Sequence, residues 1–318
     1  MTRREFIVLA GTLLMLPAAR GQAKSVKIGI LAPVKRPGAL PAILKRLGQL
    51  GFVEGKNLSV ELRSTDGVAE RSPALARELV QASCDLIIAY GYEQGARALM
   101  QASASVPIVI LALDYDPLDA GIVRSLGRPG GNVTGMYVPN VMLAAKRLEL
   151  LRETLPGAKR VLVLVDSYSA GQLKAAQTAA AQLGMEIVTA LFTAPPYDFE
   201  AAFEKGRAAR VEALLLFISP VFFEQRARIS QLVGTRRLPA MTTTTGIDNG
   251  LMSYGVNTSR TFERAGDIAA SILKGANPGD IAIEQASVFE FVVNLKVAKE
   301  LGLKIPQSVL LRADRVIE

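Results

Sequence analysis

Val26-Lys27-Ile28-Gly29-Ile30-Leu31 (residues 26–31) is the stretch that decides the fold class of this chain. It is a short apolar run, which is typical of a strand in the interior of a sheet. Residues 40–50 then carry leucine and isoleucine at helical spacing, and a second apolar run follows at 58–62. A strand, a helix and another strand in this order predict a β/α unit with two parallel strands.

The same alternation runs along most of the chain. A loop rich in glycine, proline and aspartate, residues 114–135, interrupts it, and a crossing between two halves is expected near 136–139. Further strands are predicted at 85–90, 107–113, 160–165, 186–192, 212–218 and 238–242. The sequence therefore predicts an α/β protein of two halves, each with about four β/α units and a parallel sheet.

The C-terminal part of the chain departs from this alternation. A long helix, capped by Thr258 or Ser259, is predicted to reach Leu273. Strand-like runs are found at 251–255, 281–286 and 288–293. We expect this part to return to the first half, which makes both halves discontinuous in sequence.

Basic residues outnumber acidic ones by 37 to 29, which gives a net charge of +8. Without residues 1–23 the excess falls to +6, and it is spread thinly. The densest basic groups are at 24–27 and 236–237. Because nucleic-acid binding needs clustered charge, we predict a solvated basic surface and no nucleic-acid partner.

Missing residue types and motifs exclude several chemistries. The chain has no histidine and a single cysteine, Cys84. A Ser-His-Asp triad, histidine-ligated metals and cysteine clusters for zinc or iron–sulfur are therefore excluded. The phosphate-binding patterns GxGxxG and GxxxxGK[ST] are absent as well. We predict a protein that is not an enzyme and that has no cofactor and no metal.

The N-terminus, MTRREFIVLAGTLLMLPAARGQA, has the pattern of an export signal. Arg3 and Arg4 precede an apolar stretch at 6–19, which is shorter than the ~20 residues that span a bilayer. Small residues follow, and the paired arginines resemble a twin-arginine signal. We expect residues 1–23 to be removed near Ala23 and the mature chain to be periplasmic. The general secretory route and an uncleaved anchor stay open as alternatives.

Aromatic and polar residues follow the predicted strands at their carboxyl ends, where parallel α/β sheets bind ligands. The candidate ligand-binding residues are Tyr92, Glu93, Asp114, Ser167, Ser169, Ser219 and Thr244. Rings supply apolar area, hydroxyls bind a carboxylate and an acid binds an amine, so together they suit a small organic molecule. Taken singly, each is equally explained as a turn or capping residue.

Several segments resemble one family of periplasmic solute-binding proteins. Residues 46–58 (RLGQLGFVEGKNL) are similar to its LGYVEGRN segment, and 126–135 (LGRPGGNVTG) to its LARPGGNVTG stretch. Further similarities are KRLELL at 146–151, GLMSYG at 250–255, NLKVAKELG at 294–302 and RADRVIE at 312–318. The family is that of the ABC-transporter substrate-binding proteins, which includes the tryptophan- and tyrosine-binding type.

The resemblance implies a type I periplasmic-binding-protein fold, with two Rossmann-like lobes, parallel sheets and a three-crossing hinge. We expect lobe 1 to hold 24–137 and about 252–283, and lobe 2 to hold 138–251 and about 284–318. The lobes would close on a small organic solute, an amino acid or an aromatic acid. The implied partners are an ABC permease, through which the protein meets the membrane, and its ATPase; the protein itself would be a monomer.

The resemblance transfers to the candidate site only in part. Tyr92 and Glu93 replace smaller residues of a GTP-like ligand loop, while 166–169 (DSYS) align with a serine-rich loop that meets ligand. Ser219 begins a segment that is more polar in relatives of the aromatic-amino-acid type. The ligand of this chain therefore stays open.

The same sequence features leave other functions open as alternatives. A solute sensor for a membrane receptor would use the same closure. A two-cysteine racemase is excluded by the single Cys84, and a dehydrogenase lacks its phosphate loop. A sugar-responsive repressor would need a DNA-binding headpiece where this chain has an export signal.

Overall fold

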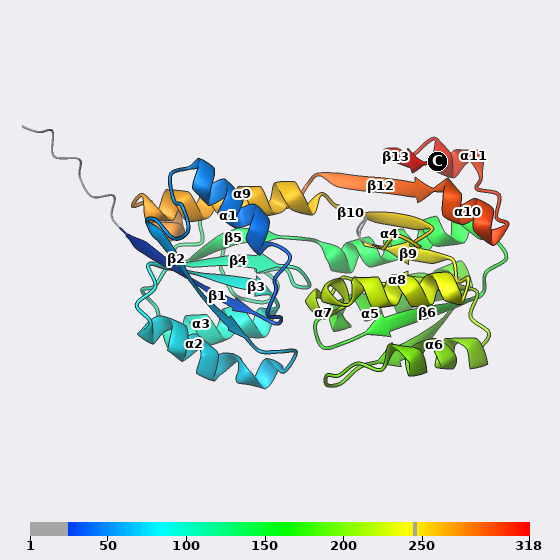
Figure 1. The fold of residues 1–318 in the computed structure, drawn as a ribbon, viewed down its shortest axis with the longest axis horizontal. Coiled ribbons are helices and arrows are strands. Elements are labelled where there is room, and N and C mark those ends of the chain that lie inside the picture. The colour runs from blue at the N-terminus through cyan, green and yellow to red at the C-terminus, as the bar shows by residue number, and fades with distance from the viewer. Residues whose placement is uncertain (1–24, 244–246) are drawn as a thin grey trace, which may run out of the picture.

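The computed structural model describes residues 25–243 and 247–318. These residues form two lobes that lie side by side along the longest axis of the molecule (Figure 1). Each lobe is a sheet with helices on both faces. The predicted signal peptide, residues 1–23, and the candidate residue Thr244 lie outside the described residues.

Lobe 1 is built on a six-stranded, all-parallel sheet. In spatial order its strands are β11 (Glu284–Gln285), β5 (Val133–Tyr137), β4 (Ile108–Ala112), β3 (Leu86–Gly91), β1 (Val26–Ala32) and β2 (Leu58–Ser64). One face is covered by α1 (Leu40–Gln49) and α9 (Thr258–Leu273), the other by α2 (Ser72–Gln81) and α3 (Glu93–Ala102). The short turns η1 (Ala69–Arg71) and η2 (Pro278–Asp280) complete the lobe.

Lobe 2 is built on a seven-stranded sheet in which only β10 and β12 pair antiparallel. In spatial order its strands are β13 (Arg315–Ile317), β12 (Phe289–Asn294), β10 (Met252–Val256), β9 (Ala240–Thr242), β8 (Ala213–Leu216), β6 (Arg160–Val165) and β7 (Glu186–Leu191). The helices on one face are α4 (Asn140–Thr154), α5 (Ala170–Leu183), α10 (Leu295–Leu301) and α11 (Gln307–Leu310). Those on the other face are α6 (Phe199–Ala208), α7 (Pro220–Glu224) and α8 (Arg226–Thr235).

The predicted α/β class is confirmed, because the apolar runs of the sequence are the strands of the two sheets. The stretch that opens the alternation, 26–31, lies in β1, whose residues from Ile28 onward are buried. β3, β4, β6 and β8 are buried along nearly their whole lengths, as strands covered by helices on both faces must be. The carboxyl ends of these strands face the junction between the lobes.

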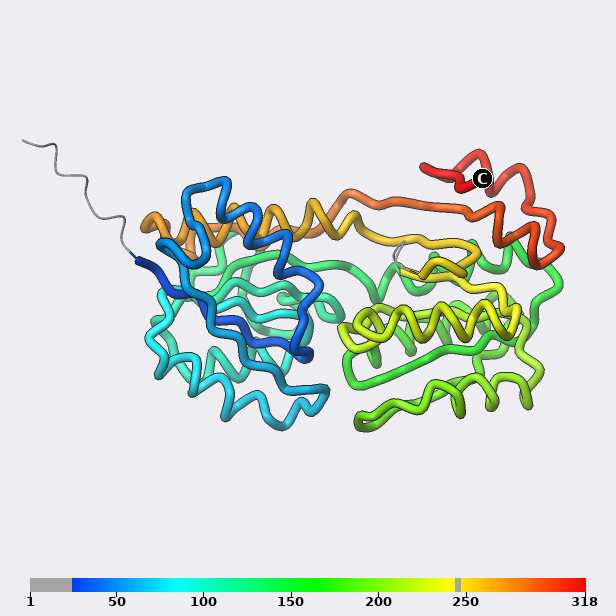
Figure 2. Tube along the Cα trace, in the orientation of Figure 1, coloured from blue at the N-terminus to red at the C-terminus, as the bar shows by residue number. Residues whose placement is uncertain are grey.

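The described chain crosses between the lobes three times (Figure 2). The first crossing lies between β5 and α4, at the predicted position. The second differs from the prediction near 252, since β10 pairs with β9 and β12 in lobe 2 and the chain crosses at Asn257. The third follows Ala286, whose N–H still bonds to Tyr137 in lobe 1. An apolar run shows that a strand exists, but the sheet it joins depends on distant partners.

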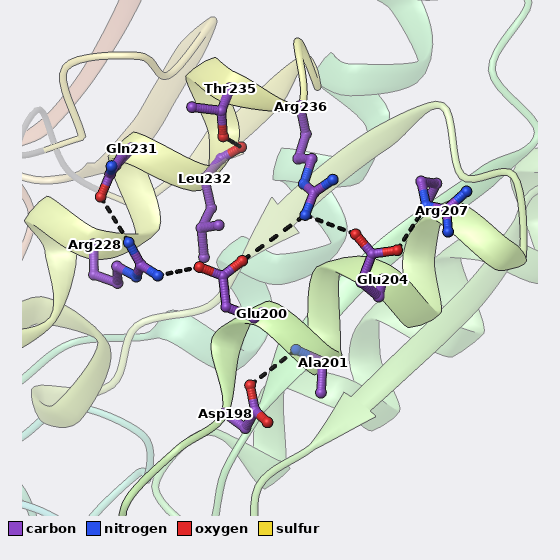
Figure 3. Close-up of polar contacts among 10 residues, drawn as sticks. All are labelled: Asp198, Glu200, Ala201, Glu204, Arg207, Arg228, Gln231, Leu232, Thr235 and Arg236. Carbon is purple, nitrogen blue, oxygen red and sulfur yellow. Dashed lines mark hydrogen bonds and ion pairs between the residues drawn. The ribbon is translucent and has the colours of Figure 1, made fainter.

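Exposed ion pairs tie α6 to α8 on the outer face of lobe 2 (Figure 3). Arg236 lies 2.6 Å from Glu204 and 3.9 Å from Glu200, and Arg228 pairs with Glu200 as well. Pairs with this exposure contribute at most about 1 kcal/mol each to stability. The network therefore adds little to the stability of the fold.

Candidate ligand-binding cleft

A cavity of about 300 Å³ lies between the lobes, and both lobes contribute to its lining. Lobe 1 supplies the loop before α1, the ends of β3 and β4, and the first turn of α9. Lobe 2 supplies the segment from β8 through α7 and the residues after β9. The aromatic lining residues are Tyr90, Phe217, Phe222, Phe223 and Phe262. The cavity is thus mainly apolar and lies where the strands of both sheets end.

Among the described residues, the polar side chains that line the cavity carry hydroxyls, apart from one cation. The hydroxyl residues that line it are Ser219, Thr242, Thr243, Thr258, Ser259 and Thr261. The cation is Arg226, and no aspartate or glutamate is among the described lining residues. Its guanidinium carbon lies 4.7 Å from the centre of the Phe223 ring. Within the described chain no carboxylate pairs with Arg226 at 4.0 Å or less.

Ser219 connects this cavity to a buried carboxyl group, that of Asp166. The Ser219 hydroxyl accepts from the N–H of Val221 and thereby caps α7, and it donates to Asp166 Oδ2 at 2.5 Å. Asp166 Oδ1 accepts from the Ser169 hydroxyl at 2.8 Å and from the Tyr168 N–H at 3.1 Å. Burial of Asp166 raises the pKa of its carboxyl. Ser169 and Ser219 therefore hold the loops after β6 and β8 together.

Two tyrosines from opposite lobes meet beside the cavity. The Tyr92 and Tyr168 rings are edge-to-face, with 5.0 Å between their centres. The Tyr92 hydroxyl lies 2.9 Å from the Ser72 hydroxyl, whereas the Tyr168 hydroxyl is buried without a hydrogen-bond partner. Both rings are almost fully buried. This contact joins the lobes in the observed arrangement.

Asp114 forms a second bridge between the lobes. Its carboxylate accepts from Gln172 Nε2 at 2.9 Å and from the Gly171 N–H at 3.4 Å, both at the start of α5 in lobe 2. Partial burial between the lobes raises the pKa of Asp114 to about 7, in spite of these donors. The nearby Asp166 carboxylate also raises the pKa of Asp114.

Glycines of lobe 1 face rings of lobe 2 along the cleft. A Cβ atom on Gly38 would lie 2.5 Å from the Phe223 ring, and one on Gly67 would lie 2.8 Å from Pro195. A Cβ atom on Gly91 would lie 3.2 Å from Pro220. The lobes approach this closely only because these positions carry no side chain. The structure is therefore that of a closed form.

The candidate ligand-binding residues predicted from the sequence lie at different places in the structure. Ser219 lines the cavity, while Tyr92 and Asp114 lie at the contact of the lobes. Glu93 lies outside the cavity lining and pairs with Arg97 at 2.5 Å. Ser167 is exposed and lies outside the lining, and Ser169 supports Asp166. Sequence reasoning missed Arg226 and the start of α9, which reaches the cavity only through the second crossing.

Residues 25–243 and 247–318 hold no cluster of three or more His, Cys, Asp or Glu that suits a metal ion. Over the same residues, no helix has both the length and the apolar character needed to cross a bilayer.

Removing the Tyr168 ring is expected to weaken solute binding, whereas removing its hydroxyl is not. Tyr168→Ala deletes the edge-to-face contact between the lobes and the apolar area that the Tyr168 ring buries. Together these losses should lower the affinity for the solute about tenfold or more. Tyr168→Phe deletes only an unpartnered buried hydroxyl, so affinity should stay within about threefold. Calorimetric titration of both variants checks this. Equal losses in the two would show that the hydroxyl has a partner in solution.

The sequence of this chain matches one protein family over nearly its whole length. The profile of the family described as ABC transporter substrate binding protein covers residues 27–317. The tyrosine-binding protein of Clostridioides difficile is 24% identical over 289 residues, which are 88% of this chain and 82% of that protein. The chain belongs to the ABC transporter substrate-binding proteins.

Solved structures show the same architecture. A conserved domain protein from Vibrio cholerae is 26% identical, with a TM-score of 0.79 over 92% of this chain and 100% of that chain. The ABC domain from Streptococcus pneumonia in complex with L-Trp is 25% identical, with a TM-score of 0.75 and the same coverage. A leucine-binding protein of Thermotoga maritima, 16% identical with a TM-score of 0.56 over 80% of this chain and 84% of that chain, shares the fold. The protein is thus a two-lobe solute-binding protein and not an enzyme.

Proposed function

We propose that the mature protein binds a small aromatic carboxylic acid between its lobes in the periplasm. The observation that carries the proposal is the lining of the cavity, which combines aromatic rings with a cation and has no acidic side chain among its described residues. A cavity of about 300 Å³ is at the lower end of the range for small-molecule sites. Its size therefore favours a compact solute with a single ring system.

The charges around the cavity favour an anion. Arg226 stands at the lining without a carboxylate partner in the described chain. The first residues of α9, Thr258 and Ser259, also line the cavity, so the positive end of a 16-residue helix points toward it. Asn257 already accepts from the N–H groups of Arg260 and Thr261, so a carboxylate at this helix start would meet the N–H groups of Thr258 and Ser259.

An aromatic amino acid is the second candidate, since relatives are a tyrosine-binding protein and a structure with L-Trp. Its ammonium group needs acceptors, and the side chains of the described lining residues offer only hydroxyl oxygens. The buried carboxyl of Asp166, which is bonded to the lining residue Ser219, already accepts from Ser169 and Ser219. The acid without an amine therefore fits the polar groups better.

A thermal-unfolding and calorimetric panel tests this proposal. Benzoate and phenylacetate are expected to bind more tightly than L-tyrosine and L-tryptophan, and tyramine, which lacks the carboxylate, is expected not to bind. A solute at a hundredfold excess over Kd raises stability by about 2.7 kcal/mol. Tight binding of L-tyrosine with none of benzoate or phenylacetate would select the amino acid. No stabilisation by any of the five would refute an aromatic ligand.

The solute would then be delivered to an ABC permease and its separately encoded ATPase, with the binding protein acting as a monomer. Closing about the three crossings is the motion that the fold allows. If the protein serves uptake, a deletion strain should lose growth on the bound solute as sole carbon source. Unchanged growth together with altered signalling would identify a sensor instead.

A further inference from the structure

Phe223 in α7 lies at the opening of the main cavity. It is one of the lining residues, yet its exposed fraction is 37%, whereas Phe217 and Phe222 of the same lining are almost fully buried. Pro41 in α1 and Arg226 in α8 are exposed lining residues as well. Figure 1 shows α7 at the edge of lobe 2 that faces lobe 1. A ring that meets both the cavity and the solvent forms part of the boundary between them.

The Phe223 ring is held in place from its own lobe. The Phe223 N–H donates to the Ser219 carbonyl at 2.9 Å, in the first turn of α7. Arg226 Nη1 donates to the Phe223 carbonyl at 2.9 Å, and the guanidinium carbon lies 4.7 Å from the centre of the ring. A guanidinium in this position is attracted to the face of an aromatic ring. Arg226 therefore supports the Phe223 ring at the opening.

Gly38 of lobe 1 meets the same ring from the other side of the opening. A Cβ atom on Gly38 would lie 2.5 Å from Cε1 of Phe223, and 3.1 and 3.2 Å from two further ring carbons. Pro37 and Ala39, which flank Gly38, are buried, and the Leu40 N–H donates to the Pro37 carbonyl at 3.1 Å. The loop is thus anchored in lobe 1. The ring fills the space that a side chain at Gly38 would take.

We propose that Phe223 limits the size of the solute, because its ring must reach Gly38 for the lobes to close. A solute that fits inside the cavity of about 300 Å³ leaves this contact intact. A solute with a second ring along its length would project through the opening, displace the Phe223 ring and keep the lobes apart. The inference rests on the proposed function only in taking the solute to be aromatic.

Pairs of solutes that differ by one ring test this limit by calorimetric titration of the mature protein. Benzoate is paired with biphenyl-4-carboxylate, and L-tyrosine with O-phenyl-L-tyrosine. In the pair whose smaller member binds, the wild type should prefer that member about tenfold or more, and Phe223→Ala should remove most of the preference. Leu191→Ala is the control and should keep the preference, since Leu191 is 65% exposed and lies outside the lining.

Gly38→Ala tests the contact itself. Gly38 does not have a positive φ, so an added methyl group acts mainly through the Phe223 ring. We expect Gly38→Ala to weaken binding of the smaller solute about threefold or more, and to have almost no effect when combined with Phe223→Ala, which removes the ring. Gly48→Ala in α1 is the matched control, because nothing lies within 4 Å of its Cβ position.

The outcomes separate this inference from the proposed function. A Phe223→Ala protein with the wild-type preference would overturn the inference, as would a Gly38→Ala effect of the same size with and without the Phe223 ring. Binding of L-tyrosine without benzoate would refute the aromatic acid, and the tyrosine pair would then decide the size limit. Binding of neither would overturn both proposals. If Phe223→Ala does not fold, Phe223→Leu, which also lacks the ring, should show the reduced preference.

Discussion

Solute binding is expected to tighten as the pH falls, by up to about tenfold per pH unit below pH 7, and Asp114→Asn is expected to remove this dependence. In the closed form the pKa of Asp114 is about 7, because its carboxyl is buried between the lobes. In an open form the same carboxyl faces water, where aspartate has a pKa of about 3.9. At a pH between these two pKa values, Asp114 takes up a proton when the lobes close. Closure therefore becomes more favourable as the pH falls.

The direction of this pH dependence follows from which form, open or closed, binds more protons. Above pH 7 both forms are ionised and binding is independent of pH; between pH 7 and about 4 only the closed form is protonated, so affinity rises as pH falls. Asp166 also has a raised pKa, but Ser169 and Ser219, its partners, belong to its own lobe and stay with it when the lobes part. Asp114 is therefore the group whose surroundings change most.

Calorimetric titration with benzoate between pH 5.5 and 8.5 measures this effect while the solute stays ionised. Glu93→Gln, which alters an exposed carboxylate paired with Arg97, is the control and should keep the wild-type slope. A slope that persists in Asp114→Asn would assign the proton to another group. A wild type without any slope would mean that Asp114 is equally buried when the lobes are open.

Gly135→Ala is expected to destabilise the protein by about 3–5 kcal/mol, a large part of the stability of a typical domain. Gly135 lies in β5 with a φ of +142°, which side chains rarely adopt. Its Cβ position is 2.1 Å from the carbonyl oxygen of Ile110 in the paired strand β4. Since the atoms that clash are backbone atoms in the middle of a sheet, no rotamer change relieves them.

Urea unfolding of wild type and variant gives the difference in free energy. Gly127→Ala is the matched control, because nothing lies within 4 Å of its Cβ position. That variant should stay within about 0.5 kcal/mol of wild type. A Gly135→Ala protein with near wild-type stability would show that β4 and β5 separate at this point without cost.

The first four strands of lobe 1 could be predicted because buried parallel strands are short apolar runs between helical stretches. The prediction of loop at 114–135 was wrong at its end, where β5 (Val133–Tyr137) begins, because Gly135 and the polar Thr134 hide this strand from an apolar pattern. The position of β10 could not, since Met252–Val256 looks the same whichever sheet it joins, and its partners are β9 and the distant β12. The same limit applies to the cleft. The strand ends pointed to Ser219 and Asp114, whereas Arg226 lies at the start of α8, away from any strand end, and only the folded chain brings it to the cavity.

The glycine-against-ring contacts between the lobes bear on how easily the protein can switch between its forms. Gly38, Gly67 and Gly91 have no side chain to immobilise, and the proline rings opposite two of them are already rigid. Ordering flexible side chains at an interface costs about 0.5–1.5 kcal/mol each, and these contacts avoid much of that entropy loss. Closing the lobes therefore costs little conformational entropy at these positions, so more of the free energy of the solute contacts remains to hold the solute.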